Sequence, residues 1–131
     1  MSRPRILSID DEVGFIEMIR QYFEPRKYPI DITSDSGKGL ELLRANVYDV
    51  VLLDLRMTEL KGDQIMRYIK QLNLDTKVIF ITAYSDSGRT KERLMAAGAY
   101  AFVEKPIMSL KFLEDIVNEA VEVKEQGGER C

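Results

Sequence analysis

The sequence predicts an α/β fold with one sheet of parallel strands and helices packed on both of its faces. Short apolar runs rich in β-branched residues alternate along the chain with segments whose apolar residues recur at helical spacing. Residues 50–53 and 78–81 are continuously apolar, as strands buried on both faces of a sheet require. With 131 residues, the chain is long enough for one domain that buries its own core.

Five segments have the composition of strands, at 5–9, 28–33, 50–53, 77–83 and 99–103. The second carries Pro29, which cannot donate to a strand ladder, so we expect this strand at an edge of the sheet. The third leads directly into Asp54, a carboxylate placed where open α/β sheets bind their ligands.

Five helices are expected after the strands, and Pro25 stops the first. We expect Ser36 to cap the second helix, Ser85 or Asp86 to cap the fourth, and Gly98 to close the fourth. Residues at helical spacing should turn toward the sheet: Phe15, Ile16, Ile19, Phe23, Leu40, Leu43, Val47, Ile65, Ile69, Leu72, Leu113, Ile116, Val117 and Ala120.

The last helix is expected to begin at Ser109, and the polar segment from Glu122 to Cys131 is expected to fray. We therefore assign residues 1–123 to the domain and 124–131 to a polar tail or the start of a linker. No internal repeat or low-complexity segment divides the chain further.

Strands that alternate with helices form a parallel sheet, and right-handed crossovers leave few strand orders. We expect a flavodoxin-like (βα)5 three-layer sandwich with the parallel sheet order 2-1-3-4-5. In this order the first, third, fourth and fifth strands are neighbours and end at the same edge. The polar residues at these ends are Asp10 and Asp11, Asp54, Thr82 and Lys105.

Composition excludes several classes of function. The chain has no histidine, which removes the usual general base, the commonest metal ligand and every Ser–His or Cys–His arrangement. Its single cysteine, Cys131, supports neither a disulfide framework nor a metal site. The net charge of −3 argues against direct binding of nucleic acid. No segment resembles a signal peptide or approaches the ~20 apolar residues of a membrane span, so we expect a cytoplasmic protein.

Each polar strand end alone has an ordinary explanation, since Asp54, for example, could cap the turn after its strand. Together they indicate a site. Two carboxylates ~4 Å apart at an effective dielectric of about 20 repel by roughly 4 kcal/mol. A hard divalent cation relieves this repulsion, and carboxylates without soft ligands favour Mg²⁺. With a lysine and a hydroxyl nearby, phosphoryl is the group that fits, and Asp54 is the natural nucleophile.

The same residues resemble those of a known family. The set that is similar to the receiver domain of bacterial two-component response regulators comprises Asp10-Asp11, Asp54, Thr82, Phe102 and Lys105-Pro106. The resemblance spans about Arg5 to Val121, nearly the whole chain.

The resemblance implies that Asp54 accepts a phosphoryl group from a phosphohistidine on a sensor histidine kinase or a histidine phosphotransfer protein. It also implies that Asp11, Asp54 and the backbone carbonyl of Arg56 hold Mg²⁺, with Asp10 assisting through water.

The resemblance further implies that Thr82 and Lys105 bind phosphoryl oxygens, with a cis Lys105–Pro106 bond placing the lysine. Thr82 would shift toward the phosphoryl group and let Phe102 swing inward, remodelling the surface of the fourth helix, fifth strand and fifth helix for output. The downstream output domain or protein stays open. So does a phosphorylation-dependent homodimer through this surface, which looks polar and would give a salt-sensitive contact.

The sequence departs from the family's pattern in three places. Thr58 stands where many members have proline, so this loop is expected to be looser. Arg56 and Tyr84, each two residues beyond a site residue, are bulky, and we expect them to crowd the site and slow self-dephosphorylation.

Two other readings stay open. One is an enzyme on the same fold, a phosphotransferase or phosphatase with an aspartate nucleophile. That class wants a second aspartate where this chain has Arg56, and we therefore expect no enzyme beyond its own phosphorylation and dephosphorylation. The other is a module that only binds partners without being phosphorylated. A site that had lost its function should lack at least one of its members, whereas this sequence keeps the full set.

Overall fold

The computed structural model describes residues 3–57, 60–72, 74–84 and 86–129, with side chains in these ranges up to Glu122. Strands and helices alternate along the chain. The strands are β1 (Ile6–Ile9), β2 (Ile30–Thr33), β3 (Val50–Leu53), β4 (Lys77–Thr82) and β5 (Ala101–Glu104). The helices are α1 (Val13–Phe23), α2 (Ser36–Ala45), α3 (Gly62–Gln71), α4 (Arg89–Ala96) and α5 (Leu110–Glu129).

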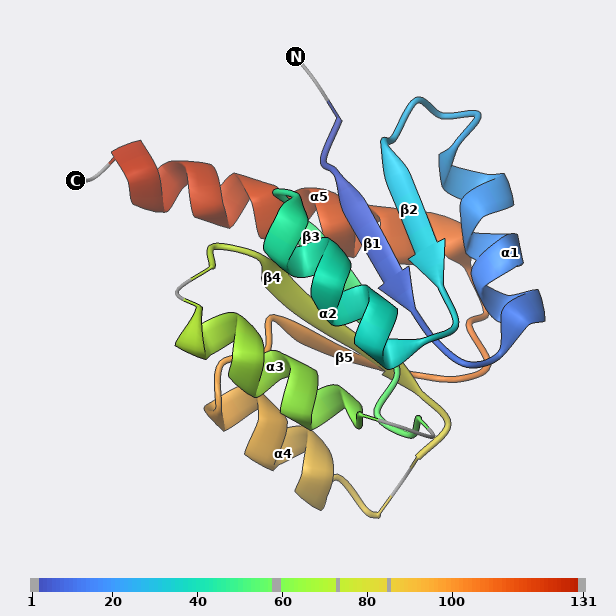
Figure 1. The fold of residues 1–131 in the computed structure, drawn as a ribbon, viewed down its shortest axis with the longest axis vertical. Helices are drawn as coiled ribbons and strands as arrows, with labels where there is room; N and C mark the ends of the chain where they lie inside the picture. Colours follow the sequence, from blue (N-terminus) through green and yellow to red (C-terminus); the bar gives the residue numbers. More distant parts are fainter. Residues whose placement is uncertain (1–2, 58–59, 73, 85, 130–131) are drawn as a thin grey trace.

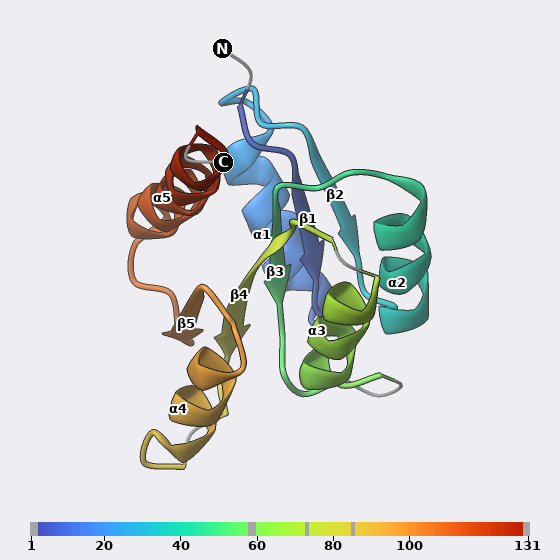
Figure 2. The same ribbon diagram turned by 90° about the vertical axis from the view of Figure 1, so that its left-hand side faces the viewer.

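The five strands form one sheet in the order β2-β1-β3-β4-β5, and every neighbouring pair is parallel. Helices α1 and α5 cover one face, and α2, α3 and α4 cover the other (Figure 1). Figure 2 shows α1 and α5 on one side of the sheet and α2 and α3 on the other. This confirms the three-layer sandwich and the strand order expected from the sequence.

The central strand β3 is buried along its whole length, which agrees with its unbroken apolar sequence. Its residues alternate between two cores, because successive side chains on a strand point to opposite faces. Val51 and Leu53 pack with α2, α3 and α4, whereas Val50 and Leu52 pack with α1 and α5. By contrast, β2 is only half-buried and lies at an edge of the sheet, as its proline predicted.

Several helix ends differ from the expectations. The second helix is capped by Asp35, whose side chain accepts a hydrogen bond from the N–H of Lys38, and not by Ser36. Ser36 lies one residue inside the helix, where its hydroxyl instead accepts from the N–H of Leu60. At the other end of the chain, the hydroxyl of Ser109 accepts from the N–H of Phe112, so α5 does begin as expected.

The fourth helix begins later than a cap at residue 85 or 86 would imply, because Gly88 is its N-cap. Ser85 lies outside the described residues. Asp86 still supports the first turn, since its carboxylate accepts from both the N–H and the hydroxyl of Thr90. Gly98 has a φ of +114°, a left-handed conformation that favours glycine, and closes the helix as predicted.

Two apolar residues were wrongly expected to face the sheet. Val47 lies after the end of α2 and is 78% exposed, and Leu72 caps the end of α3 and is 41% exposed. Both lie within two residues after the last residue of their helix. The last helix, in turn, continues to Glu129 although we expected fraying from Glu122, and its end extends past the sheet (Figure 1). Among the described helices, none combines the length and the apolar character that crossing a bilayer requires.

Candidate functional site

Four strands deliver polar side chains to the same edge of the sheet. Asp10 follows β1, Asp54 follows β3, Thr82 ends β4, and Lys105 follows β5. The parallel register aligns these ends, because Ile9 pairs with Leu53 and Thr82 pairs with Glu104. The sequence-based expectation that these residues share one edge is therefore met by the structure.

Three carboxylates converge at this edge. Asp10, Asp11 and Asp54 each offer an oxygen within 4.8 Å of the others'. Asp10 and Asp54 are buried, and Asp11 is exposed and closes the cluster on the solvent side. Three carboxylate oxygens in a cluster that is open to solvent on one side suit a divalent cation such as Mg²⁺, which keeps several bound waters. The donor set contains no soft ligand that would favour another metal.

Asp10 carries the electrostatic cost of this arrangement. Burial raises the pKa of its carboxyl above the ordinary value, and the nearby Asp54 raises it further. Two donors partly offset the effect: the N–H of Glu12 lies 2.9 Å from one oxygen, and Nζ of Lys105 lies 2.8 Å from the other.

Lys105 is held by two acids at the rim of the site. Its Nζ lies 2.8 Å from Oδ2 of Asp10 and 2.8 Å from Oε1 of Glu12, and 4.3 Å from the centre of the Phe15 ring. Burial lowers the pKa of the ammonium, but the hydrogen bonds to Asp10 and Glu12 outweigh this, and the pKa is raised. The Lys105–Pro106 peptide bond is cis, as the resemblance implied. Glu12 and Phe15 were not assigned to the site from sequence, although Glu12 ends the same acidic run.

Thr82 is buried and keeps its hydroxyl hydrogen available. Its Oγ1 accepts a hydrogen bond from the N–H of Tyr84 at 3.2 Å, an arrangement in which the hydroxyl hydrogen can still be donated to an acceptor. The Tyr84 ring is in turn covered by Arg56, whose guanidinium carbon lies 4.6 Å from the ring centre. The two bulky residues that the sequence singled out are thus in contact, and the N–H of Arg56 donates to Oδ1 of Asp54 at 3.4 Å.

Gly62 is a residue of the site that the sequence analysis missed. A Cβ at this position would lie 2.3 Å from the carbonyl oxygen of Asp54, so the first residue of α3 packs directly on the backbone that follows β3. The signal available in the sequence was the glycine at the start of a helix that follows a loop. Thr58, on which the looser loop was expected, lies outside the described residues.

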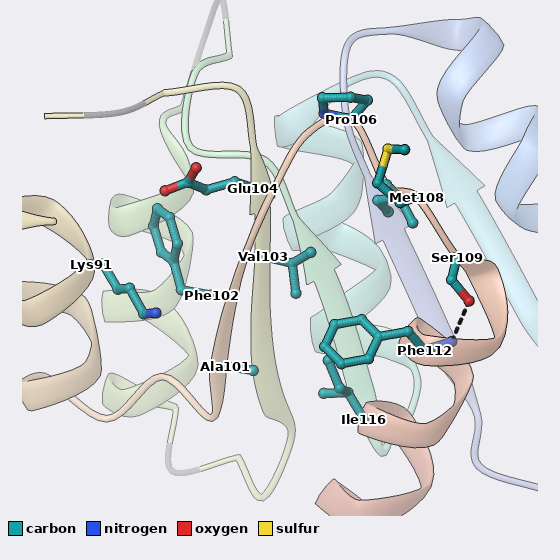
Figure 3. Close-up of a pocket in the computed structure, with 11 residues that line it drawn as sticks. Lys91, Ala101, Phe102, Val103, Glu104, Pro106, Met108, Ser109, Phe112 and Ile116 are labelled. Carbon is teal, nitrogen blue, oxygen red and sulfur yellow. Dashed lines mark hydrogen bonds between the residues drawn. The ribbon is translucent and has the colours of Figure 1, made fainter. Parts of the chain in front are cut away.

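Phe102 lies on the edge strand β5, where it pairs with Phe80 of β4. Its ring is half-buried against the core under α3 and α4, with its centre 6.3 Å from that of Phe80. In Figure 3 the ring points toward α4 and lies between Lys91 and Glu104. Its outer side borders a hollow of about 580 Å³ along β5, which we call the β5 groove.

The β5 groove corrects one expectation. The surface formed by α4, β5 and α5 looked polar in sequence, but the groove is lined mainly by apolar side chains. Phe112 is 57% exposed and Met108 is 90% exposed, so two large apolar residues are open to solvent on this surface. Sequence reasoning missed them because Phe112 lies outside the buried stripe of α5 and Met108 lies in the segment before that helix.

A parallel sheet with a cluster of acids, a lysine and a hydroxyl at its carboxyl edge defines an open α/β domain whose candidate site lies at the ends of its strands. Comparison with known proteins identifies the family. Residues 6–118 match the family described as the response regulator receiver domain. The chain belongs to this family, which is regulatory, and the fold and resemblance expected from the sequence are confirmed.

Relatives and solved structures agree with this assignment. The response regulator ArlR of Staphylococcus saprophyticus is 37% identical over 102 residues, which are 78% of this chain and 46% of ArlR. The receiver domain of the Francisella response regulator 1452 superimposes with a TM-score of 0.85 at 25% identity, covering 93% of this chain and 99% of that one. The response regulator TrrA of Thermotoga maritima, solved in complex with Mg²⁺ and BeF, has a TM-score of 0.77 at 28% identity and covers 90% of this chain and 99% of that one. The chain spans about half the length of the curated relatives it matches.

Proposed function

We propose that this domain is a phosphorylation-controlled switch whose phosphoacceptor is Asp54. The observation that carries the proposal is the convergence of Asp10, Asp11 and Asp54, with ligand oxygens within 4.8 Å of one another, at the same sheet edge as Thr82 and Lys105. This edge combines a carboxylate nucleophile with groups that neutralise phosphoryl charge, the requirements for phosphoryl transfer.

The metal that we propose for the site is Mg²⁺, held by Asp11, Asp54 and the backbone carbonyl of Arg56, with Asp10 assisting through water. When bound, Mg²⁺ would neutralise charge on the phosphoryl oxygens and on the acids. The proposal is supported by the three oxygen donors and by the raised pKa of Asp10, which is caused by burial first and by the neighbouring Asp54 carboxylate to a smaller extent.

In the proposed transfer, a carboxylate oxygen of Asp54 attacks the phosphorus of a phosphohistidine on a sensor histidine kinase or a histidine phosphotransfer protein. A P–O bond forms as the P–N bond breaks, and the released imidazole takes up a proton. Nζ of Lys105 and the hydroxyl of Thr82 would bind the phosphoryl oxygens. Burial of Asp54 keeps bulk water from competing for the phosphorus.

The switch that we propose couples Thr82 to Phe102. As Thr82 moves toward the phosphoryl group, the space behind it admits the Phe102 ring, and the surface of α4, β5 and α5 changes. Output would pass from this surface to a downstream domain or protein, or to a second copy of the chain. The domain would act in the cytoplasm, would not contact nucleic acid or membrane itself, and would catalyse only its own phosphorylation and dephosphorylation.

The proposal is tested by incubating the chain with Mg²⁺ and phosphoramidate and then measuring its intact mass. We expect one phosphoryl group on the wild type and none on Asp54→Asn. The exposed Asp75→Asn, outside the site, serves as the matched control and should be modified like the wild type. Continuous release of phosphate beyond one equivalent would instead identify an enzyme, and no modification of any variant would identify a module that only binds partners.

A further inference from the structure

The β5 groove follows an open edge of the sheet. Strand β5 pairs with β4 on one side only, and no strand of the described chain lies on its other side. The register pairs Ile79 with Ala101 and Ile81 with Val103, and the N–H of Lys105 donates to the carbonyl of Thr82 at 2.8 Å, so the backbone groups of the odd-numbered residues face β4. Because backbone groups alternate along a strand, those of Phe102 and Glu104 point away from β4, toward the open edge.

The two walls of the groove differ in chemistry. On the α5 side, Val103, Phe112 and Ile116 form an apolar wall, and Figure 3 shows the Phe112 ring beside Ile116. On the α4 side, the Phe102 ring lies between Lys91 and Glu104, two exposed charges of opposite sign (Figure 3). The unpaired edge of β5 therefore runs between an apolar wall and a charged wall.

We propose that the β5 groove binds an extended segment of a partner protein, which adds to the sheet as a sixth strand beside β5. Side chains of a strand point alternately to its two sides, so the segment that fits is amphipathic with a period of two. Apolar residues at alternate positions would pack on Phe112 and Ile116. Between them, an acidic residue would face Lys91 and a basic residue would face Glu104.

Main-chain pairing favours an extended segment over a helix as the occupant. A helix uses its backbone N–H and C=O groups internally and would leave those of Phe102 and Glu104 without partners, which is costly once water is excluded. An extended segment supplies both groups at the matching spacing. Four paired residues span about 13 Å, the length of β5 itself.

This inference names the class of partner that would bind the proposed output surface. It rests on the proposed function only for the statement that this surface carries the output. The groove is open in the unmodified chain, so binding is measured without phosphorylation. The two proposals can therefore fail separately: the chain could bind the peptide without ever being phosphorylated, and it could be phosphorylated on Asp54 without binding the peptide.

The probe is a phage-displayed library of random linear decapeptides, selected on the unmodified chain. The best peptide is then synthesised and its Kd measured against three variants. We expect Phe112→Asp and Met108→Asp each to raise the Kd by about tenfold or more. Val47→Asp, which places the same charge on an exposed apolar residue elsewhere, should leave it unchanged. All three positions are exposed, so the variants should fold.

Strand addition makes a prediction that other binding modes do not. N-methylation of the peptide at alternate residues should abolish binding, because those N–H groups pair with β5, and methylation at the residues between should be tolerated. Amide hydrogen exchange of Phe102 and Glu104 should slow by about tenfold or more on binding, whereas that of Ala101 and Val103, which face β4, should change little. The proposal would be overturned by sensitivity at every third or fourth peptide residue, by unprotected amides at Phe102 and Glu104, or by a Kd that does not respond to Phe112→Asp. Self-association that closes the groove, seen in sedimentation, would also overturn it.

Discussion

Gly62 packs against the backbone of the proposed phosphoacceptor, and its replacement by alanine tests how strictly that contact positions Asp54. The new Cβ would lie 2.3 Å from the carbonyl oxygen of Asp54, about 1 Å short of an ordinary contact. The obstructing atom is backbone and cannot rotate away, so the overpacking cost should reach the upper end of the usual range, about 3 kcal/mol. Helix propensity returns up to about 1 kcal/mol. The net expectation is a loss of roughly 2 kcal/mol.

The measurement is urea unfolding followed by circular dichroism, with the midpoint compared at constant slope. Gly14→Ala in α1 is the matched control, because nothing lies within 4 Å of the Cβ that it would add. The control should gain about 0.5–1 kcal/mol from helix propensity alone. At temperatures where both variants are folded, phosphorylation by phosphoramidate should be about 100-fold slower in Gly62→Ala, since a displacement of about 1 Å at a reacting group has effects of this size.

The reasoning would be refuted if Gly62→Ala matched Gly14→Ala in stability and in phosphorylation rate. A loss of stability with a normal rate would refute the functional half only. It would mean that the acceptor loop adjusts without moving the carboxylate.

Three further outcomes are expected. Ser8→Ala should stabilise the chain by about 1 kcal/mol, because the buried Ser8 hydroxyl has no hydrogen-bond partner among the described residues. Ser36 is equally buried but its hydroxyl accepts a hydrogen bond from a backbone N–H, so Ser36→Ala should instead destabilise the chain by about 1–2 kcal/mol. Thermal unfolding of the two variants measures this difference. The double variant Arg56→Ala and Tyr84→Ala removes two stacked side chains that crowd the site, so it should shorten the lifetime of the phosphorylated state about tenfold, which corresponds to about 1.4 kcal/mol of activation free energy. A dephosphorylation time course measures this lifetime, and an unchanged or longer lifetime would contradict the expected crowding. Burial raises the pKa of Glu114, but hydrogen bonds from two tyrosine hydroxyls outweigh this effect and lower the pKa below 4.5. The carboxylate therefore stabilises the fold above about pH 4.5, and this stabilisation is lost as the pH falls. The wild type should be more stable than Glu114→Gln by about 1 kcal/mol at pH 7, and this difference in unfolding free energy should vanish in acid.

The fold was predictable because its signals are local. Val50 to Leu53 is an apolar run that only a doubly covered strand can bury, and Pro29 marks the edge strand. The errors fell where a helix stops. Val47 and Leu72 continue the helical spacing, but each lies past the last helical residue and is exposed. Spacing alone does not reveal where a helix ends.

The site was predictable to the level of which residues meet, since parallel strands bring their carboxyl ends to one edge. Asp54 and Lys105 directly follow their strands and Thr82 ends its strand, so strand order alone places the three together. The ion pairs of Lys105 with Asp10 and Glu12 could not be read in the same way. They depend on how a long side chain crosses from β5 to the loop after β1.

The sequence by itself determined the sheet, the polar strand ends and the family resemblance, because each depends on residue type and on spacing along the chain. Only the tertiary structure decided what surrounds them. It brought Gly62 against the Asp54 carbonyl, stacked Arg56 on Tyr84, and opened an apolar groove beside β5. These are contacts between segments distant in sequence or packed around an open edge, and they depend on the angles and distances at which helices settle on the sheet.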